Sequence, residues 1–216
     1  MANDTRTAVA VRVQYSVAPE RMPLIPPEKM TEDQRQAAAE IAAGPRGNVR
    51  GPFVAMMRSP GFMRPCQALG AYVRFGCPID VRLREMAALM GARHYTQQYE
   101  WFVHVPHALK SGVDQSIIDA IRDGHRPGRM APDEEIVYEF FSELFANKGV
   151  SDPTYAKALA QFGEAGIVDL VGVVGYYVMI GMIMNVARTG MPEGKPLPLA
   201  PLPDQVRVTG TGDEKR

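Results

Sequence analysis

A segment near the middle of the chain places acidic, basic and amide side chains at helical spacing. Residues 97–104 have the sequence QQYEWFVH, so Gln97, Glu100 and His104 are separated by three and four positions. On a helix these three side chains share one face. Glu85 lies twelve residues before Gln97, on the preceding predicted helix. Two carboxylates and an imidazole that meet across a helix pair are the groups of a proton-transfer site.

His104 on its own would be interpreted as a packed or exposed histidine. The two nearby carboxylates favour a functional interpretation, because convergent titratable groups mark sites. Glu100 could instead lie on a solvated face, but its neighbours Tyr99 and Trp101 favour a partly buried position. A buried carboxylate is costly unless it is paired. A hydrogen bond to His104, one helical turn later, would satisfy both groups.

The same residues resemble a known family motif. Glu85, Gln97, Glu100 and His104 have the spacing of Glu-x11-Cys-x2-Cys-x3-His, with Gln97 and Glu100 in place of the two cysteines. That motif marks the carboxymuconolactone decarboxylase and alkylhydroperoxidase D-like (AhpD-like) superfamily. The letters REMAAL around Glu85 and YEWFVHVP around Glu100 resemble its non-redox, decarboxylase-like branch. The resemblance covers residues 60–191.

The resemblance implies a cofactor-independent carboxy-lyase that acts on a small carboxylated lactone from aromatic-compound catabolism. His104 would be the general acid, Glu100 would hold its tautomer and charge, and Glu85 would orient it or relay a proton from behind. No cofactor is expected, because the lactone carbonyl can delocalise the developing charge. The resemblance also implies a homo-oligomer (dimer, trimer or hexamer).

Further side chains are candidates for contact with a small carboxylate substrate. An arginine on the Glu85 helix, Arg82, Arg84 or Arg93, could bind a carboxylate with two hydrogen bonds, although surface charge is the more ordinary role. His94 lies near a helix end, where a structural role is expected. No His-x3-His pair or acid-rich set favours a metal site, so none is predicted. The predicted substrate-binding residues are Gln97, Tyr99, Trp101, Arg93 and His107.

Other functions remain alternatives. A thiol peroxidase needs a reactive thiolate and a resolving thiol, and Gln97 and Glu100 remove both from the motif. Cys66 and Cys77 match no redox or metal spacing and are interpreted as packed thiols in a reducing compartment. Another proton-transfer enzyme on the same scaffold, an isomerase or a hydrolase, and a non-catalytic oligomeric binding protein both stay open.

Composition limits the class of protein. The 216 residues are 46% hydrophobic and 22% charged, with no net formal charge. A chain of this length can bury one substantial core. Its charge balance gives no electrostatic reason to bind nucleic acid or an anionic membrane. The N-terminus lacks the apolar run of a secretory signal, so a cytoplasmic location is expected.

Residues 170–187 carry no charge, and a membrane span needs roughly 20 apolar residues. Several glycines and Asn185 interrupt this stretch, and charged residues flank it. A helix that is apolar on all sides can equally be the central helix of an all-α core or part of an oligomer interface. We therefore predict no membrane partner.

The rest of the chain predicts an all-α, AhpD-like helical bundle, because no useful stretch alternates apolar and polar residues. An extended arm is expected over 1–30, one helical domain over 31–189 and a flexible, proline-rich tail over 190–216. Thr31, Asp80, Thr96 and Asp114 are predicted N-caps. The expected helices cover about 31–43, 60–76, 81–94, 97–111, 115–122, a segment from 132, 152–165 and, after a break at Gly166, 167–188.

Overall fold

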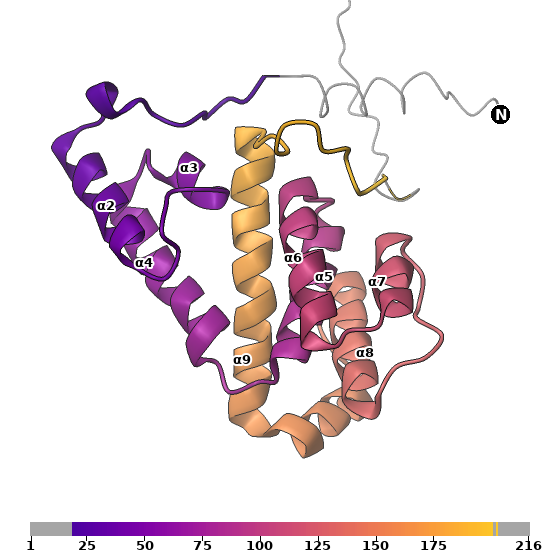
Figure 1. The fold of residues 1–216 in the computed structure, drawn as a ribbon. Helices are drawn as coiled ribbons and strands as arrows, with labels where there is room; N and C mark the ends of the chain where they lie inside the picture. Colours follow the sequence, from indigo (N-terminus) through magenta and orange to yellow (C-terminus); the bar gives the residue numbers. More distant parts are fainter. Residues whose placement is uncertain (1–18, 201, 203–216) are drawn as a thin grey trace, which may run out of the picture.

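The computed structural model describes residues 19–200 and 202, and this part of the chain is helical without any strand. The all-α prediction is therefore confirmed (Figure 1). The α-helices are α2 (Glu32–Ala43), α3 (Pro52–Met56), α4 (Pro60–Ala71), α5 (Val81–His94), α6 (Gln98–Ser111), α7 (Gln115–Arg122), α8 (Pro132–Asn147) and α9 (Asp152–Ala187). A 3₁₀ turn, η1 (Pro27–Lys29), precedes them, and a π-helical turn, η2 (Tyr72–Gly76), follows α4.

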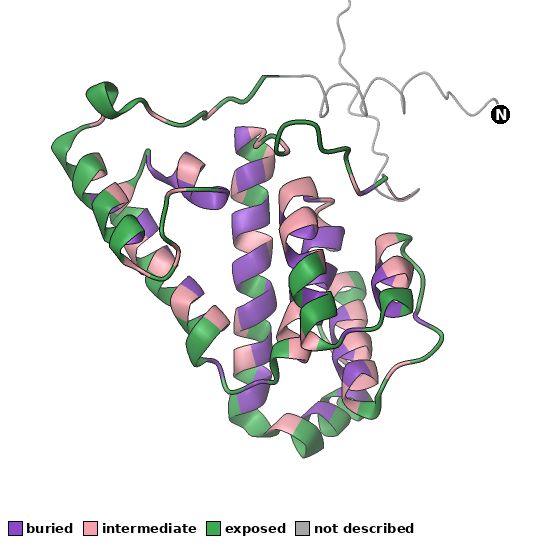
Figure 2. Cartoon of the chain, in the orientation of Figure 1, coloured by how far each residue is buried: buried purple, intermediate pink, exposed green. Residues whose placement is uncertain are grey.

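Helix α9 forms the centre of the molecule. It runs between the N-terminal helices α2–α4 on one side and α5–α8 on the other (Figure 1). Buried residues recur along its length (Figure 2), including Val173, Tyr177 and Met184. Among the described residues, α9 alone is long and apolar enough to cross a membrane, a test that the core helix of a soluble protein also passes. Its neighbours here include α5, which carries Glu85, together with α3 and α8.

Local capping fixes where most helices begin. The side chain of Thr31 accepts from the backbone of Gln34 in a full capping box, as predicted. Asp80 and Asp114 accept from the backbone N–H two residues later and cap α5 and α7, also as predicted. These caps are short-range contacts between a side chain and the backbone beside it, so they can be predicted from sequence.

The predicted cap at Thr96 is wrong. Gln97 is the N-cap of α6, and its side chain accepts a 2.8 Å hydrogen bond from the backbone N–H of Glu100. Thr96 has a φ of 47° and belongs to the preceding turn, where its N–H donates to the carbonyl of Arg93. The longer amide of Gln97 therefore takes the capping role and fixes the backbone at Glu100.

The predicted break before the long apolar helix also lies elsewhere. Gly163, with φ 66° and ψ 175°, interrupts α9, whereas Gly166 is helical and buried. A Cβ on Gly166 would stand 2.7 Å from Cβ of Phe162, so this glycine permits close packing. The short helix α3 was not predicted, because five residues give too little periodicity to recognise.

The ends of the described chain pack against the helices. The backbone N–H of Arg21 donates to the carbonyl of Ala187 at the end of α9. Leu199 is buried, and its backbone exchanges two hydrogen bonds with the side chain of Gln98. The rest of the predicted arm and tail, 1–18, 201 and 203–216, lies outside the described residues.

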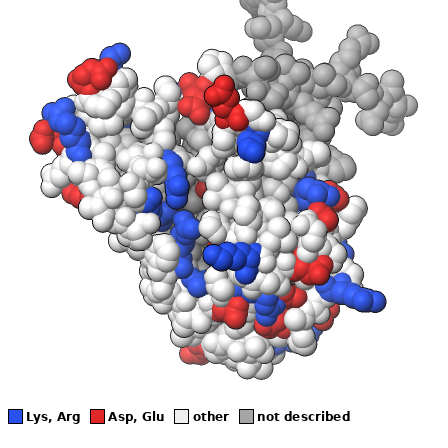
Figure 3. Space-filling model, viewed as in Figure 1, with Lys and Arg blue, Asp and Glu red and all other residues white. Residues whose placement is uncertain are grey.

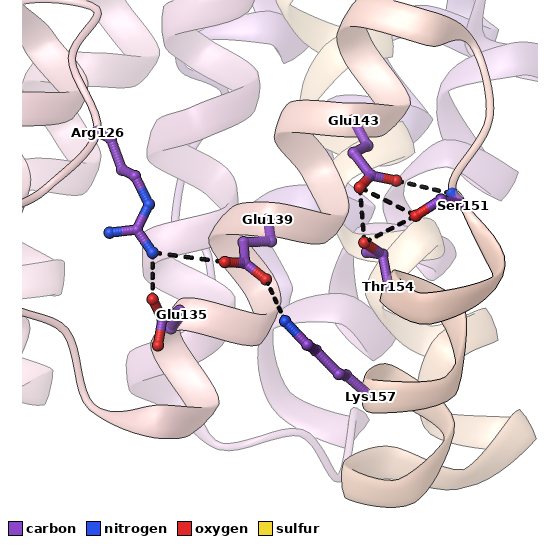
Figure 4. A network of polar contacts seen from close by, with 7 residues as sticks. All are labelled: Arg126, Glu135, Glu139, Glu143, Ser151, Thr154 and Lys157. Atoms are coloured by element: carbon purple, nitrogen blue, oxygen red, sulfur yellow. Dashed lines mark hydrogen bonds and ion pairs between the residues drawn. The ribbon is translucent and has the colours of Figure 1, made fainter.

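A polar surface network joins α8 to the loop before it and to the start of α9 (Figure 4). Glu139 accepts from Lys157 at 2.9 Å and from Arg126 at 3.4 Å. Glu143 accepts from the backbone and hydroxyl of Ser151 and from the hydroxyl of Thr154. We call the seven residues Arg126, Glu135, Glu139, Glu143, Ser151, Thr154 and Lys157 the surface network.

Candidate functional site

Three titratable side chains meet where α5 packs against α6. Nδ1 of His104 lies 2.7 Å from Oε2 of Glu85, and Nε2 lies 3.2 Å from Oε2 of Glu100. The side chains of His104, Glu100 and Glu85 are 3%, 5% and 12% exposed. We call these three residues the buried cluster. Both ring nitrogens are engaged, so the imidazole bridges the two carboxylates.

This arrangement favours a protonated imidazole. Burial alone would lower the pKa of His104, but its hydrogen bonds to Glu100 and Glu85 and their negative charges raise that pKa to about 9. Burial likewise opposes ionisation of Glu85, yet its hydrogen bond with His104 holds the pKa of that carboxyl below its usual value. At neutral pH the buried cluster therefore holds a proton on His104 that it can donate.

A cavity of about 210 Å³ opens beside the buried cluster. Its wall includes Glu100 and His104 but not Glu85, so Nε2 is the ring nitrogen on the cavity side. Figure 3 shows Lys and Arg side chains gathered in the furrow between the N-terminal helices and the body of the molecule. The lining residues come from the α2–α3 connection, α3, η2, α6 and α9. They include three arginines, Arg46, Arg50 and Arg74, and a group of aromatic and titratable side chains, namely Phe53, Tyr99, Glu100, His104, His107, Tyr176 and Tyr177.

The cavity carries net positive charge. Three arginines and the His104 imidazolium outweigh the carboxylate of Glu100, even when Glu85 behind the imidazole is included. His107 also lines the cavity, and burial lowers its pKa against the opposing charge of Glu85. A low-dielectric cleft with one dominant sign of charge favours a ligand of the opposite sign. The wall therefore suits an anionic small molecule.

Aromatic rings hold the imidazole in place. The ring of Tyr177 packs edge-on against His104, with centroids 4.6 Å apart and an interplanar angle of 76°.

Tyr99 approaches the α2–α3 connection so closely that a Cβ on Gly51 would stand 2.8 Å from its ring. Gly51 also has a φ of 56°, which a residue with a side chain adopts only with strain. This contact places Tyr99 in the cavity wall.

The structure places the predicted site residues in two groups. Tyr99 and His107 line the cavity beside Glu100 and His104. Trp101, Gln97 and Arg93 do not belong to its wall. Trp101 lies in the core and is 3% exposed. The amide oxygen of Gln97 accepts the α6 capping hydrogen bond from the backbone of Glu100, and its amide nitrogen donates to Asn185. Arg93 donates to the carbonyl of Ala200 at 2.7 Å.

The other candidate arginines of α5 are also engaged elsewhere. Arg82 forms ion pairs with Asp133 and Glu134. Arg84 donates to the carbonyls of Val73 and Arg74. The arginines that do line the cavity, Arg46, Arg50 and Arg74, belong to the α2–α3 connection and to η2. The sequence spacing around Glu85 does not predict that these three arginines line the cavity, because only tertiary packing brings their segments to α6.

Two further features are not part of the cavity wall. Cys66 and Cys77 are both buried and unbonded, and burial raises the pKa of Cys66 to about 11 against the opposing charge of Arg46. A thiol with that pKa is a poor nucleophile at neutral pH. A more open hollow of about 570 Å³ near Arg82 holds no comparable cluster, since that arginine is already paired with Glu134.

Known proteins offer no further guide to this site. No family model matches the chain, and the searches of curated proteins and of solved structures found no match. Across residues 19–200 and 202, no group of three or more His, Cys, Asp and Glu side chains is placed to hold a metal ion. The buried cluster and its cavity are therefore the features of the molecule that indicate a function.

Proposed function

We propose that the protein is a cofactor-independent carboxy-lyase that resembles carboxymuconolactone decarboxylase and acts on a small carboxylated lactone. One observation carries this proposal: the imidazole of His104 bridges the carboxylates of Glu85 and Glu100 and lines a small cavity whose wall also holds three arginines. The motif spacing of Glu85, Glu100 and His104 supports the same reaction class. A net positive cavity also fits a carboxylated substrate.

In the proposed reaction, the bond between the ring carbon and its carboxylate breaks and CO₂ leaves. The electron pair delocalises into the lactone carbonyl, which gives a dienolate. A carbon of the dienolate then takes the proton from Nε2 of His104, the nitrogen on the cavity side. The imidazole becomes neutral, and solvent restores its proton before the next turnover.

The two carboxylates have different roles in this scheme. Glu85 contacts Nδ1 at 2.7 Å from behind the ring, so it fixes the ring orientation and stabilises the imidazolium. Glu100 contacts Nε2 at 3.2 Å and lines the cavity, so it holds the transferable proton on the substrate side. Both carboxylates touch the imidazole directly, which makes the cluster a single proton-transfer unit.

The test is a reaction in D₂O with a set of carboxylated lactones. We expect release of CO₂ and one deuterium at the carbon that is protonated. His104→Gln should lower the rate by roughly 10²–10⁴-fold if the imidazole is the general acid. Deuterium exchange or ring opening without CO₂ release would instead identify an isomerase or hydrolase. Full activity in folded His104→Gln would remove the mechanism.

The non-catalytic alternative makes a different prediction. A binding protein with this cavity would bind carboxylated lactones and leave them unchanged. Detection of the intact lactone after prolonged incubation with a stoichiometric amount of protein would favour that alternative over the lyase.

A homo-oligomer is part of the proposal. Large apolar side chains are exposed on η2 and α9, including Phe75 at 60% and Val168 at 70%. The hydroxyl of Tyr72 donates to Asp169 at 2.7 Å, so η2 and α9 adjoin at this surface. Sedimentation of the purified protein without detergent should show an oligomer, and a well-behaved monomer would contradict this part.

A further inference from the structure

Arg74 of η2 is an accessible cation in the cavity wall. The residue is half-buried and lines the cavity together with His104 and Tyr177. Within residues 19–200 and 202, its guanidinium has no hydrogen bond or ion pair, and none of its side-chain nitrogens is closed to solvent. An arginine side chain has donors but no acceptor, and it stays charged in proteins. These donors are therefore open to the oxygen atoms of a ligand.

Neighbouring groups show which end of the cavity Arg74 occupies. Burial has the largest effect on the pKa of His107 and of Tyr177, lowering the first and raising the second, and the charge of Arg74 lowers both. The rings of these two residues are also neighbours of the His104 imidazole, at 6.1 Å and 4.6 Å between centroids. Such electrostatic effects fade with distance. Arg74 therefore lies at the end of the cavity that holds the proton donor.

The backbone that carries Arg74 is a π-helical turn, a rare form that is frequent at functional sites. The turn closes with a 2.7 Å hydrogen bond from the N–H of Cys77 to the carbonyl of Tyr72. The next residue is Pro78, which has no N–H to donate to the carbonyl of Val73 or of Arg74. The end of η2 thus leaves two carbonyls that need donors from elsewhere.

Arg84 of α5 supplies those donors. Its Nη1 donates to the carbonyl of Val73 at 2.7 Å and to the carbonyl of Arg74 at 2.8 Å. Arg84 does not line the cavity, and Glu85, the next residue of α5, contacts Nδ1 of His104. Consecutive residues of one helix therefore hold two parts of the site: Glu85 orients the proton donor, and Arg84 fixes the turn that carries Arg74.

We propose that Arg74 binds the carboxylate of a small organic acid in this cavity, and that Arg84 is the positioning residue that holds Arg74 there. Arg–carboxylate contacts are commonly bidentate, and a carboxylate offers the two acceptor oxygens that such a contact needs. The cavity, at about 210 Å³, restricts the acid to a small one. The inference rests on the proposed function for the identity of the acid, but the binding itself can be tested without turnover.

The other two arginines of the wall are placed differently. Arg46 has Nη2 buried, and its guanidinium lies over the ring of Phe53, with Cζ 4.5 Å from the centroid. Arg50 is exposed; burial raises the pKa of Tyr99 and the charge of Arg50 opposes that rise, so Arg50 lies on the Tyr99 side of the wall. Both arginines add to the positive potential that attracts anions. Arg50 is consequently a matched control for Arg74, with the same charge in the same wall.

The experiment is calorimetric titration with benzoate, and with benzamide as its uncharged counterpart. We expect the wild-type protein to bind benzoate at least about tenfold more tightly than benzamide. Arg74→Met should weaken benzoate binding by about 10–100-fold, the loss expected for a hydrogen bond to a charged group, and should change benzamide affinity by less than about threefold. Arg50→Met should weaken benzoate binding by less than about threefold.

The positioning role of Arg84 has its own test. Arg84→Met should weaken benzoate binding by about tenfold, because η2 loses the donors that hold Arg74 in place. Arg84→Lys should restore the affinity to within about threefold of wild type, since an ammonium group can also donate to two carbonyls. The double variant with Met at both positions should bind benzoate no more weakly than Arg74→Met, because Arg84 acts only through Arg74. A merely structural defect would show neither the rescue by lysine nor this dependence on Arg74.

Arg82→Met is the control on α5. It removes an arginine two positions before Arg84 whose ion pairs with Asp133 and Glu134 lie outside the cavity wall, so benzoate affinity should not change even where stability falls. Circular dichroism checks the fold of each variant. If Arg84→Met does not fold, Arg84→Gln replaces it, and the titration of Arg74→Met still decides the carboxylate contact.

Several results would overturn the inference. No benzoate binding by the wild-type protein, benzamide binding as tight as benzoate, or an equal loss in Arg74→Met and Arg50→Met would reject the carboxylate contact. Inorganic phosphate that displaces benzoate at equal concentration would show a general oxyanion site instead. Losses that multiply in the double variant, or no rescue in Arg84→Lys, would reject the positioning role.

The inference and the proposed lyase can fail separately. Benzoate binding that depends on Arg74, in a protein that converts no lactone, would retain the carboxylate contact and reject the lyase. Turnover that needs His104 but is indifferent to Arg74 and Arg84 would do the reverse.

Discussion

The buried cluster and the surface network both join opposite charges across helices, but solvent reaches them to very different extents. In the buried cluster the side chain of His104 is 3% exposed, whereas Arg126 and Lys157 of the surface network are 50% and 56% exposed. Water competes for the ion pairs that Arg126 and Lys157 form with Glu135 and Glu139 (Figure 4). It has little access to the imidazole between Glu85 and Glu100.

The difference decides what each set of charges can do. Exposed ion pairs are screened by water and salt and contribute roughly 0–1 kcal/mol each. Buried charges must be paired, and the pairing shifts their proton affinity. The pKa of His104 accordingly rises to about 9. The surface network can position α8 against the start of α9, while the buried cluster can also hold and release a proton.

The largest expected effect concerns coupling between His104 and Glu100. His104→Gln and Glu100→Gln should each lower turnover by roughly 10²–10⁴-fold, since each removes one member of the proton-transfer unit. The double variant should be little worse than either single one, because groups that act as a unit are strongly non-additive. The coupling between the two residues is obtained from the turnover of the accepted lactone by the wild-type protein, the two single variants and the double variant. Losses that multiply would show that the two residues act independently.

Removal of a partner inside the cluster should also cost stability. Glu85→Gln leaves the His104 imidazolium without the carboxylate on Nδ1, and breaking a buried pair costs about 3–5 kcal/mol. Urea unfolding at pH 7 measures the change in the free energy of unfolding. A change below about 1 kcal/mol, the range of a surface pair, would erase the energetic difference between the two regions.

Stability should depend on pH through His104. Its folded pKa of about 9 exceeds the ordinary value of 6.5, so the stabilisation is fully present below pH 6.5 and is lost as the pH rises through about 9. The whole effect is about 3 kcal/mol. Glu85 contributes in the acidic range. Its pKa is lowered in the folded protein, so its contribution to stability is present above pH 4.5 and is lost as the pH falls through its pKa in the folded state.

The measurement compares urea unfolding at pH 6.5 and pH 9.5 in the wild-type protein and in His104→Gln. The difference between the two proteins isolates His104 from the lysines and tyrosines that also titrate at high pH. An equal loss of stability in both proteins between these pH values would show that His104 is not the titrating group.

Local interactions explain what the sequence predicted. Thr31, Asp80 and Asp114 cap helices through contacts within three residues, and short polar side chains favour such caps wherever they occur. Glu100 and His104 share a helix face by spacing alone. Glu85 joins them because α5 and α6 are consecutive and pack together. The all-α class followed from periodicity in the same way.

Tertiary packing explains what the sequence did not predict. Arg46 and Tyr176 are far apart in the chain and meet only because the α2–α3 connection and α9 both pack against Gly70 of α4. Nothing in the spacing of either residue marks it. Gln97 shows a smaller failure, since its motif position suggested substrate contact, whereas the backbone of α6 uses its amide as a cap. Residue types predicted a proton-transfer site, but the folded chain was needed to find the arginines that line the cavity beside it.

The smallest expected effect is in the surface network. Glu139→Gln makes the same chemical change as Glu85→Gln but at a side chain that is 29% exposed, between Lys157 and Arg126. We expect the free energy of unfolding to fall by less than about 1 kcal/mol, because water solvates the charges that lose their partner. This loss of unfolding free energy should be smaller still in 1 M NaCl, where the Debye length is about 3 Å. Turnover should not change, since none of the seven network residues lines the cavity.

Urea unfolding of both Gln variants at low and high salt makes the comparison direct. A loss in Glu139→Gln that matches Glu85→Gln and resists salt would mean that solvent exposure does not separate the two regions.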